Sequence, residues 1–184
     1  MGVQLNECEI PAVLEFKSDL FGDDRGYFTE FYNEVAAREL GFEETFVQDN
    51  LSCSSRGVLR GLHYQLNPHA QGKLVRCITG SIFDAVVDIR VGSKTFGQYV
   101  TRELSAKAGN ALWVPVGFAH GFLSLEDDTH VMYKCTVHWA NGMERTIRYD
   151  DPDIGIDWPS EPTLVNQKDL EAPVLSEAEN NFTI

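Results

Sequence analysis

Between Lys73 and Val137 the chain is a series of short β-rich runs separated by turn residues. The expected strands cover residues 73–79, 82–89, 99–104, 111–114, 121–125 and 131–137. Gly80 and Ser81 are typical of a hairpin turn between the first two runs. Pro115 should end its run or place it at a sheet edge, and residues 126–128 form a polar turn. Many short strands with such turns predict an all-β sandwich or barrel.

The two ends of the chain read differently from the middle. Helical signal covers residues 33–40, where Asn33 can cap the first turn and Gly41 can stop the helix. From Asp150 onward the chain carries nine acidic residues, a single base at Lys168, and four prolines that divide it into loops. We expect this segment to be an appendage on the barrel, so that residues 1–184 form one domain.

The charge of the chain is negative overall but uneven. A net charge of −13 argues against nucleic acid as a partner of the general surface. No Asp or Glu occurs between residues 50 and 83, where Arg56, Arg60, Lys73 and Arg76 fall. This is either a chance cluster of surface charge or a local anion site, and the motifs in the same segment favour the anion site.

Composition also bears on the compartment. No apolar stretch approaches the length of a membrane span, and the N-terminus lacks the basic head and apolar run of a secretory signal. The cysteines, Cys8, Cys53, Cys77 and Cys135, are widely spaced without a zinc pattern, which predicts reduced thiols. We therefore expect a cytoplasmic protein that binds no membrane.

Two motifs carry candidate chemistry. In the run 57–65, His63 and Gln65 are two positions apart on an expected strand and so share one face. The second motif places Gly109, Pro115, Gly117 and His120 at fixed spacing. Together they resemble the two signature motifs of the cupin superfamily, which implies a jelly roll, or double-stranded β-helix.

The first motif departs from the metal-binding cupins. Gln65 stands where those proteins have a second His, and no Glu follows at the expected distance. A metal site needs about three to four converging ligands, and only His63, His120 and, less convincingly, His69 are available. We therefore expect a pocket without metal or other cofactor, although two buried core histidines would also fit this pattern.

Strand alternation adds two polar side chains. Tyr133 shares the apolar face of its strand with Val131 and Cys135, so it should point into the barrel. Lys73 opens the strand after the His63 motif, on the face of Val75, although a Lys there is more often a surface residue. A His, a Tyr and a Lys around one cavity suit proton transfer at a carbon next to a ketone, which needs a base, an acid and a cation near the enolate.

A family resemblance covers residues 21–173. It rests on ordered segments at residues 24–30, 48–50, 57–65, 73–76, 84–90, 115–121, 133–136, 150–153 and 168–169. Through them the chain resembles the dTDP-4-dehydrorhamnose 3,5-epimerases. The resemblance implies a dTDP-sugar substrate, epimerisation at C3 and C5, no cofactor, and a homodimer that exchanges strands.

The resemblance also implies residue roles. His63 would be the base, oriented by Asp169, with Tyr133 the acid on the other face and Lys73 the group that stabilises the enolate. The implied substrate-binding residues are Arg25, Glu30, Gln48, Asp49, Asn50, Arg60, His120, Trp139, Glu144 and Lys168.

Several alternatives stay open. Strict alternation would place Arg60 and His63 on opposite faces, unless Gly61 permits a bulge or Arg60 serves a neighbouring subunit. Trp139 stands where the family commonly has a tyrosine, which leaves the nucleotide and the number of epimerised carbons open. The other readings are an epimerase acting at one carbon, a metal-dependent dioxygenase using His63, His69 and His120, and a sugar-binding protein without catalysis.

Overall fold

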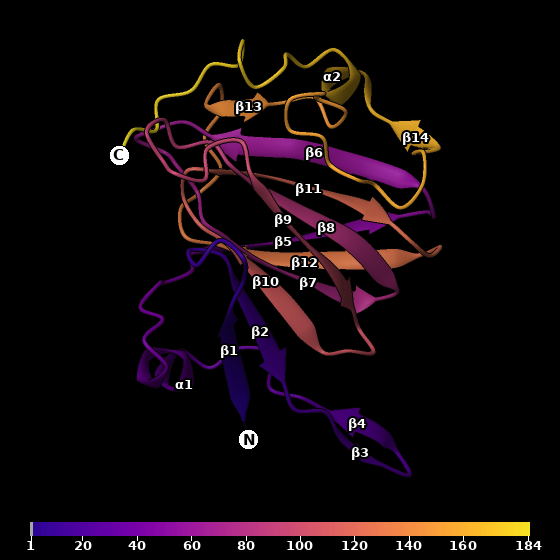
Figure 1. The fold of residues 1–184 in the computed structure, drawn as a ribbon. Helices are drawn as coiled ribbons and strands as arrows, with labels where there is room; N and C mark the ends of the chain where they lie inside the picture. Colours follow the sequence, from indigo (N-terminus) through magenta and orange to yellow (C-terminus); the bar gives the residue numbers. More distant parts are fainter. Residues whose placement is uncertain (1) are drawn as a thin grey trace.

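The computed structural model describes residues 2–184, in which strands predominate (Figure 1). The strands are β1 Val3–Glu7, β2 Leu14–Ser18, β3 Phe21–Asp23, β4 Gly26–Phe28, β5 Gln48–Ser54, β6 Val58–Gln65, β7 Lys73–Thr79, β8 Ser81–Asp88, β9 Tyr99–Ser105, β10 Asn110–Val114, β11 Phe118–Ser124, β12 Thr129–Cys135, β13 Glu144–Thr146 and β14 Leu164–Val165. The helices are α1 Glu34–Glu39 and α2 Gln167–Leu170. The predicted all-β class with a short N-terminal helix and a C-terminal appendage is confirmed.

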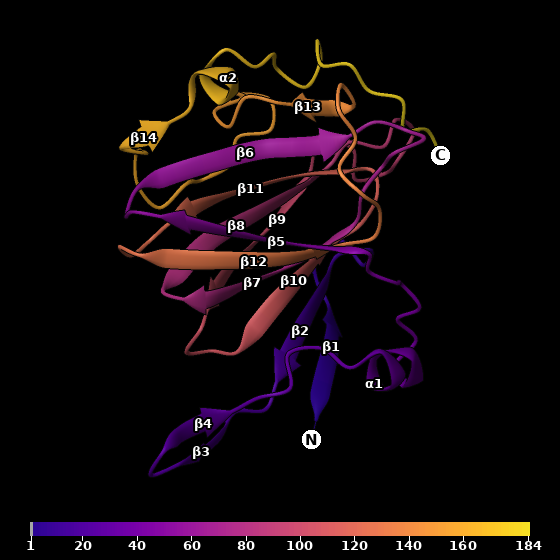
Figure 2. The ribbon, with the colours of Figure 1, turned by 180° about the vertical axis from the view of Figure 1, so that it is seen from behind.

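Two sheets face each other to form the jelly roll. The first sheet has the strand order β1-β2-β10-β7-β12-β5, and the second has the order β13-β6-β11-β8-β9 with β14 added in parallel to β6. A separate two-stranded hairpin, β3-β4, projects away from the barrel on the side opposite the C-terminal segment (Figures 1 and 2).

The predicted hairpin at Gly80 is wrong. β7 lies in the first sheet between β10 and β12, whereas β8 lies in the second sheet between β11 and β9. The Gly80 turn therefore carries the chain from the first sheet to the second. β11 and β12 are likewise divided between the two sheets, and β10 is an interior strand that ends before Pro115.

The core lies between the sheets and shows the predicted alternation. Val75, Val86, Leu112 and Val131 are among the fully buried side chains there, and Tyr133 packs against them. Burying such aliphatic side chains contributes roughly 1.5–3 kcal/mol each.

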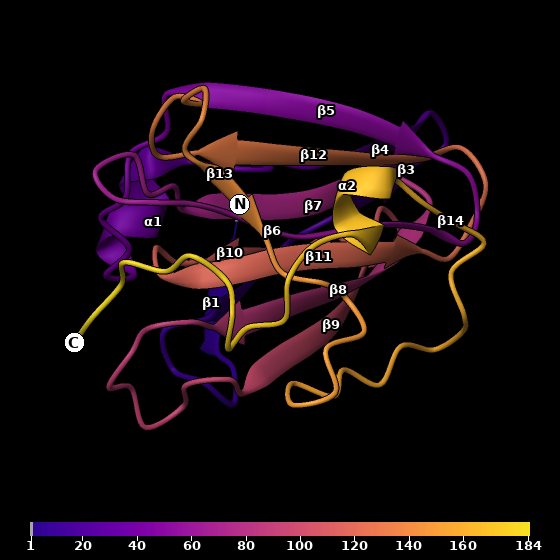
Figure 3. The ribbon, with the colours of Figure 1, turned by 90° about the horizontal axis from the view of Figure 1, so that it is seen from above.

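Each sheet also has a covered outer face. Asn33 caps α1, as predicted, by accepting hydrogen bonds from the backbone N–H groups of Val35 and Ala36. Ala37 of this helix packs against the first sheet. Phe42 then packs on Phe16 and Trp113. In the second sheet, β14 extends the edge beside β6. The C-terminal chain covers the outer face of this sheet, where Ile154 and Leu175 pack in one cluster with Leu62 and Val87 (Figure 3). No helix in residues 2–184 is both long and apolar enough to cross a membrane.

Candidate active site

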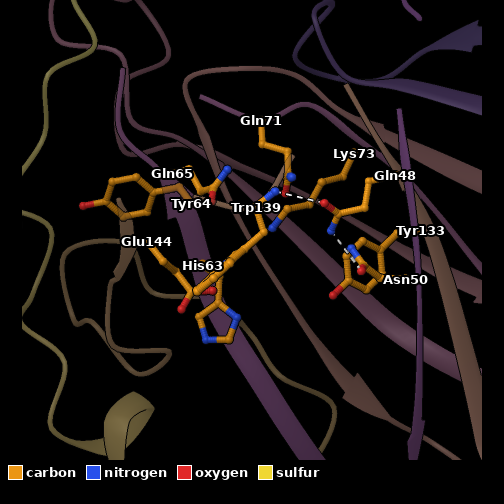
Figure 4. Close-up of a pocket in the computed structure, with 10 residues that line it drawn as sticks. All are labelled: Gln48, Asn50, His63, Tyr64, Gln65, Gln71, Lys73, Tyr133, Trp139 and Glu144. Carbon is orange, nitrogen blue, oxygen red and sulfur yellow. Dashed lines mark hydrogen bonds between the residues drawn. The ribbon is translucent and has the colours of Figure 1, made fainter. Parts of the chain in front are cut away.

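A pocket of about 560 Å³ opens at one end of the barrel (Figure 4). The residues that line it are Gln48, Asn50, His63, Tyr64, Gln65, Gln71, Lys73, Tyr133, Trp139 and Glu144. They come from strands β5, β7 and β12 of the first sheet, strands β6 and β13 of the second, and two loops. Residues far apart in the sequence therefore meet because both sheets contribute to the same opening.

His63 and Asp169 form a hydrogen-bonded pair at this pocket. Nε2 of His63 lies 2.7 Å from Oδ1 of Asp169, whose side chain is fully buried. The other oxygen, Oδ2, accepts the Gly61 N–H at 3.1 Å and the Asn166 amide at 3.2 Å. Asn166 also caps α2, which fixes Asp169 in the first turn. The C-terminal segment thus folds back onto β6, as the predicted dyad requires.

The charge state of Asp169 follows from these contacts. Burial by itself raises the pKa of this carboxyl, but the hydrogen bonds from His63 and Gly61 outweigh burial and hold the pKa below its ordinary value. Asp169 is therefore ionised at neutral pH. Within residues 2–184 the His63 ring has no other hydrogen bond, so a neutral imidazole that donates from Nε2 keeps the Nδ1 lone pair free to accept a proton.

Tyr133 and Lys73 lie on the opposing sheet, and both side chains line the pocket from the face that strand parity predicted (Figure 4). Lys73 Nζ lies 5.9 Å from the centroid of the Tyr133 ring. Burial raises the pKa of Tyr133, so its phenol stays protonated at neutral pH and is available as an acid. Burial lowers the pKa of Lys73, and the nearby Cys135, Glu144 and Asp84 act in the opposite direction.

His120 lies behind the pocket rather than in its lining. Its Nε2 is 2.7 Å from Oδ1 of Asp84, and both side chains are buried between the sheets. Burial raises the pKa of Asp84, while the His120 contact opposes that rise. Sequence reasoning assigned no role to Asp84, although an acid at the inward parity of Ile82 and Val86 was a usable signal.

His69 lies on an exposed turn beyond β6. Within residues 2–184 no three His, Cys, Asp or Glu side chains converge in a way that would hold a metal ion. The four cysteines are unpaired, with Cys53 exposed and the other three buried.

Arg60 and His63 turn toward the same interior. The pairing of β6 with β11 shifts register between His120 and Phe122, opposite Gly61. Gly61 has φ +125°, and a Cβ there would lie 2.4 Å from Cα of Gly121, so only glycine fits. Arg60 then reaches β5 of the opposing sheet, donating to Ser54 Oγ at 3.1 Å and to the Cys53 carbonyl at 3.1 Å. The bulge resolves the conflict with strict alternation.

The acid-free segment only partly serves this site. Lys73 lines the pocket and Arg60 points between the sheets. Arg76, in contrast, is on the outer face of β7, where its guanidinium lies 4.1 Å from the centroid of the Phe31 ring. Arg56 is exposed on the loop before β6.

The other predicted binding residues are divided by location. Gln48, Asn50, Trp139 and Glu144 line the pocket, and Lys168 pairs with Glu144 at its rim. Burial by itself raises the pKa of Glu144, but the Lys168 contact and the charges of His63 and Lys73 lower it below its ordinary value. Asp49 does not line the pocket, because alternation along β5 turns it outward to Lys134 at 2.8 Å.

Arg25 and Glu30 are not brought to the pocket of their own chain. Arg25 lies at the tip of the β3–β4 hairpin with 90% of its side chain exposed and pairs with Asp23. Glu30 follows β4 and accepts a hydrogen bond from the Asn33 amide at 3.1 Å. The β3–β4 hairpin that carries Arg25 projects away from the barrel (Figures 1 and 2).

Known proteins resemble this chain over most of its length. Residues 7–177 match the family model described as dTDP-4-dehydrorhamnose 3,5-epimerase. A dTDP-4-dehydrorhamnose 3,5-epimerase of Shigella flexneri is 48% identical over 174 residues, covering 94% of this chain and 96% of that protein. One of Pseudomonas aeruginosa is 49% identical over 172 residues, covering 92% and 94%.

Solved structures agree with the sequence relatives. The Legionella pneumophila dTDP-6-deoxy-D-glucose-3,5-epimerase in complex with dTDP-4-keto-L-rhamnose superposes with a TM-score of 0.91 at 42% identity, covering 96% of this chain and 94% of that one. A 3'-monoepimerase from Streptomyces bikiniensis in complex with dTDP-quinovose gives a TM-score of 0.88 at 33% identity, covering 93% and 87%. The family model and the near full-length identities together show that this chain belongs to the dTDP-4-dehydrorhamnose 3,5-epimerase family.

Proposed function

We propose that this protein converts dTDP-4-dehydro-6-deoxy-D-glucose into dTDP-4-dehydro-L-rhamnose by inverting C3 and C5, as a step of dTDP-rhamnose synthesis. The observation that carries the proposal is that His63 on the second sheet, paired with Asp169 of α2, faces Tyr133 and Lys73 on the first sheet around one pocket. An acid and a base on opposite walls are what inversion at a carbon needs, and a protein that only binds sugar needs neither.

The chemistry follows from these positions. Nδ1 of neutral His63 removes the proton from C5, and the electron pair of that C–H bond moves to the C4 ketone oxygen as an enolate. The Lys73 ammonium stabilises the enolate oxygen. When the enolate collapses, the Tyr133 hydroxyl gives its proton to the other face of C5. Solvent then restores both residues, and the same sequence inverts C3 without any change of oxidation state, so no cofactor is required.

Substrate binding divides along the pocket. Gln48, Asn50 and Trp139 line the pocket and would bind the nucleotide sugar, while Glu144 and Lys168 lie at its rim. Arg60 and His120 lie behind the lining and would bind the substrate from there, Arg60 through the diphosphate. Arg25 and Glu30 reach a pocket only if a second copy of the chain supplies them.

A homodimer that exchanges its hairpins is part of the proposal. The β3–β4 hairpin exposes large apolar side chains, with 45% of Phe21, 58% of Tyr27 and 61% of Phe28 accessible. Strand β5 forms an edge of the first sheet and leaves Leu51 64% exposed. Open edges and exposed aromatic side chains are features that a partner chain would cover. We place the enzyme, as one domain of residues 1–184, in the cytoplasm.

The decisive experiment counts deuterium. Purified protein is incubated in deuterated water with dTDP-4-keto-6-deoxyglucose, and the product is reduced and examined by NMR and mass spectrometry. Deuterium at both C3 and C5 with inverted configuration supports the proposal. Deuterium at a single carbon would instead show a monoepimerase. This is the second candidate function, and it is supported by the likeness to the Streptomyces bikiniensis enzyme.

The same assay separates the metal-dependent alternative. A dioxygenase using His63 would consume oxygen and lose activity after treatment with a chelator and dialysis. We expect full epimerase activity after that treatment, since the proposed steps use only side chains of this chain. Activity that disappears with chelator and returns with a divalent ion would contradict the proposal.

A further inference from the structure

The loop between β12 and β13 is held at the pocket mouth by side-chain amides. Residues 137–140 belong to no strand, yet their backbone groups are bonded to three glutamines from other parts of the chain. The loop carries Trp139, whose side chain lines the pocket although 56% of the residue remains exposed. An exposed aromatic ring on an irregular loop stays in one place only if the backbone under it is fixed.

The three contacts come from different directions. Gln71 Nε2 donates to the carbonyl of Val137 at 2.7 Å. Gln48 Oε1 accepts the Trp139 N–H at 2.9 Å, and Gln65 Oε1 accepts the Ala140 N–H at 2.8 Å (Figure 4 shows the Gln48 contact). One hydrogen bond before Trp139, one after it and one at its own amide therefore restrict the position and rotation of this residue.

Both ends of the Gln65 side-chain amide are hydrogen-bonded to loop backbone. It is 4% exposed, and its Nε2 donates to the carbonyl of His69 at 2.9 Å while its Oε1 holds Ala140. The residue in the position where metal cupins have a His ligand is thus joined at both ends of its amide to loops. Buried amides that are satisfied in this way keep a single orientation.

Gln48 connects the loop to the pocket wall. Its Nε2 donates to Asn50 Oδ1 at 3.0 Å, and Asn50 Nδ2 donates to Cys135 Sγ at 3.4 Å. The chain of donors from Trp139 N–H to Cys135 fixes which end of each amide faces the pocket.

We propose that Gln65 and Gln71 are positioning residues that, with Gln48, preset Trp139 to bind the nucleotide of the substrate. The proposal rests on the proposed function, because it assigns the nucleotide of that substrate to this rim. Neither Gln65 nor Gln71 takes part in proton transfer. Loss of an anchor should therefore weaken binding, through loss of preorganisation, and leave the chemical step at saturation unchanged.

The test uses Gln71→Met and Gln65→Met, which keep an unbranched side chain of similar length and remove the amide. Gln98→Met is the matched control, since Gln98 is exposed and its side chain forms no hydrogen bond within residues 2–184. We expect the dissociation constant for dTDP and the KM for the dTDP-sugar to rise about three- to tenfold in each anchor variant, which corresponds to one net hydrogen bond. The kcat should stay within about twofold of wild type.

A spectroscopic readout separates positioning from direct contact. The chain has three tryptophans, so 5-fluorotryptophan labelling gives three fluorine resonances, with that of Trp139 identified by Trp139→Phe. In the ligand-free anchor variants we expect the Trp139 resonance to shift and broaden while those of Trp113 and Trp158 stay as in wild type. The Gln98→Met spectrum should match wild type throughout.

Two outcomes would overturn the proposal. A Trp139 resonance unchanged in the free variants, with weaker binding, would mean that the glutamines contact substrate directly. Unchanged binding of dTDP and of the dTDP-sugar would mean that the loop keeps its conformation without the glutamine contacts. If Gln65→Met fails to fold, as judged by circular dichroism, Gln71→Met decides alone because Gln71 is only partly buried. Wild-type protein that fails to turn over the dTDP-sugar would refute the proposed function, while the fluorine spectra of free protein would still judge the anchors.

Discussion

The Nε2 atom of His63 lies 2.7 Å from Oδ1 of Asp169, although 106 positions separate the two residues along the chain. The Gly61 N–H and the Asn166 amide orient the carboxylate independently of His63. The carboxylate can therefore fix the orientation of the imidazole ring. Such a pair fixes the tautomer of the base and stabilises the imidazolium that forms when the base accepts a proton.

Removal of the base should abolish the reaction. His63→Ala is expected to lose deuterium uptake at C5 and epimerised product together, with a fall in kcat of about 10²–10⁴-fold, the usual contribution of a general base. Asp169→Asn should lose less, because the imidazole remains but is no longer held by a charge. Exchange of the C5 proton by His63→Ala at the wild-type rate would exclude His63 as the base.

Tyr133→Phe separates the two proton transfers. The substitution keeps the ring packed against the core and removes only the hydroxyl. Because His63 is unaffected, we expect proton exchange with solvent to persist while inverted product falls steeply. NMR of the reaction in deuterated water measures both quantities at once. Wild-type rates of product formation in Tyr133→Phe would show that the final proton comes from elsewhere.

Lys73→Met tests the stabilisation of the enolate. Methionine preserves most of the buried chain but removes the charge next to the reacting oxygen. The kcat should fall by about 10²–10³-fold, as it does when one donor to an oxyanion is removed, while dTDP binds as before. A variant with normal kcat but weak dTDP binding would move Lys73 from catalysis to nucleotide recognition.

Arg60→Ala and Arg25→Ala should mainly weaken substrate binding. Each charge-assisted hydrogen bond to the diphosphate contributes about 1.5–3 kcal/mol, so the dissociation constant should rise about 10- to 100-fold. Arg56→Ala is the control, because Arg56 shares the acid-free segment but is exposed on a loop. An unchanged dissociation constant in either variant would remove that arginine from the binding site.

The exposed position of Arg25 allows a sharper test by mixing chains. If Arg25 serves the partner's pocket, a mixed dimer of Arg25→Ala and His63→Ala chains contains one intact pocket. An equal mixture after subunit exchange, assayed at substrate concentrations well below the wild-type KM, then regains about a quarter of wild-type activity. If Arg25 served its own pocket, no mixed dimer would contain an intact pocket and no activity would return.

Asp88 should make stability depend on acid pH. Burial by itself raises the pKa of this carboxyl, but hydrogen bonds from Arg90, Ser93 and Thr95 prevail and lower it to about 2. A depressed folded-state pKa stabilises the protein above the unfolded value of about 3.9. This contribution, roughly 2 kcal/mol, is lost as the pH falls from about 4 through 2.

Chemical unfolding measured between pH 6 and pH 2 checks this expectation. Asp88→Asn should be less stable at pH 6 and should lose less stability than wild type on acidification. Asp150→Asn is the control, because Asp150 pairs with Arg148 on the surface, where ion pairs contribute little. Equal acid sensitivity of Asp88→Asn and wild type would show that other carboxyl groups control the acid transition.

Local features were predictable from the sequence because they depend on neighbouring residues. The period of two along a strand placed His63 with Gln65 on one face, and it turned Tyr133 inward with Val131. The helix after Asn33 could be predicted because its capping residue lies directly before its first turn. Alternation and residue chemistry also indicated proton transfer, whereas the assignment of individual substrate-binding residues came from likeness to a family.

Pairing between distant segments was decided only by the tertiary structure. Gly80 was typical of a hairpin, yet β7 and β8 lie in different sheets. The residues of a tight turn do not determine which sheet the next strand joins. Alternation along β6 failed at Gly61, where close approach to Gly121 shifts the register and brings Arg60 to the side of His63.

The same distinction explains the site. The sequence by itself determined the strands in the middle of the chain, their inward faces and the inventory of acids and bases, since these follow from residue chemistry and alternation. Only the closed barrel brought Asp169 from the C-terminal segment to His63, put Asp84 against His120 and left Arg25 on a hairpin that projects from it. Those placements depend on long-range packing, in which each contact gains its free energy only after the loop between its partners has been ordered.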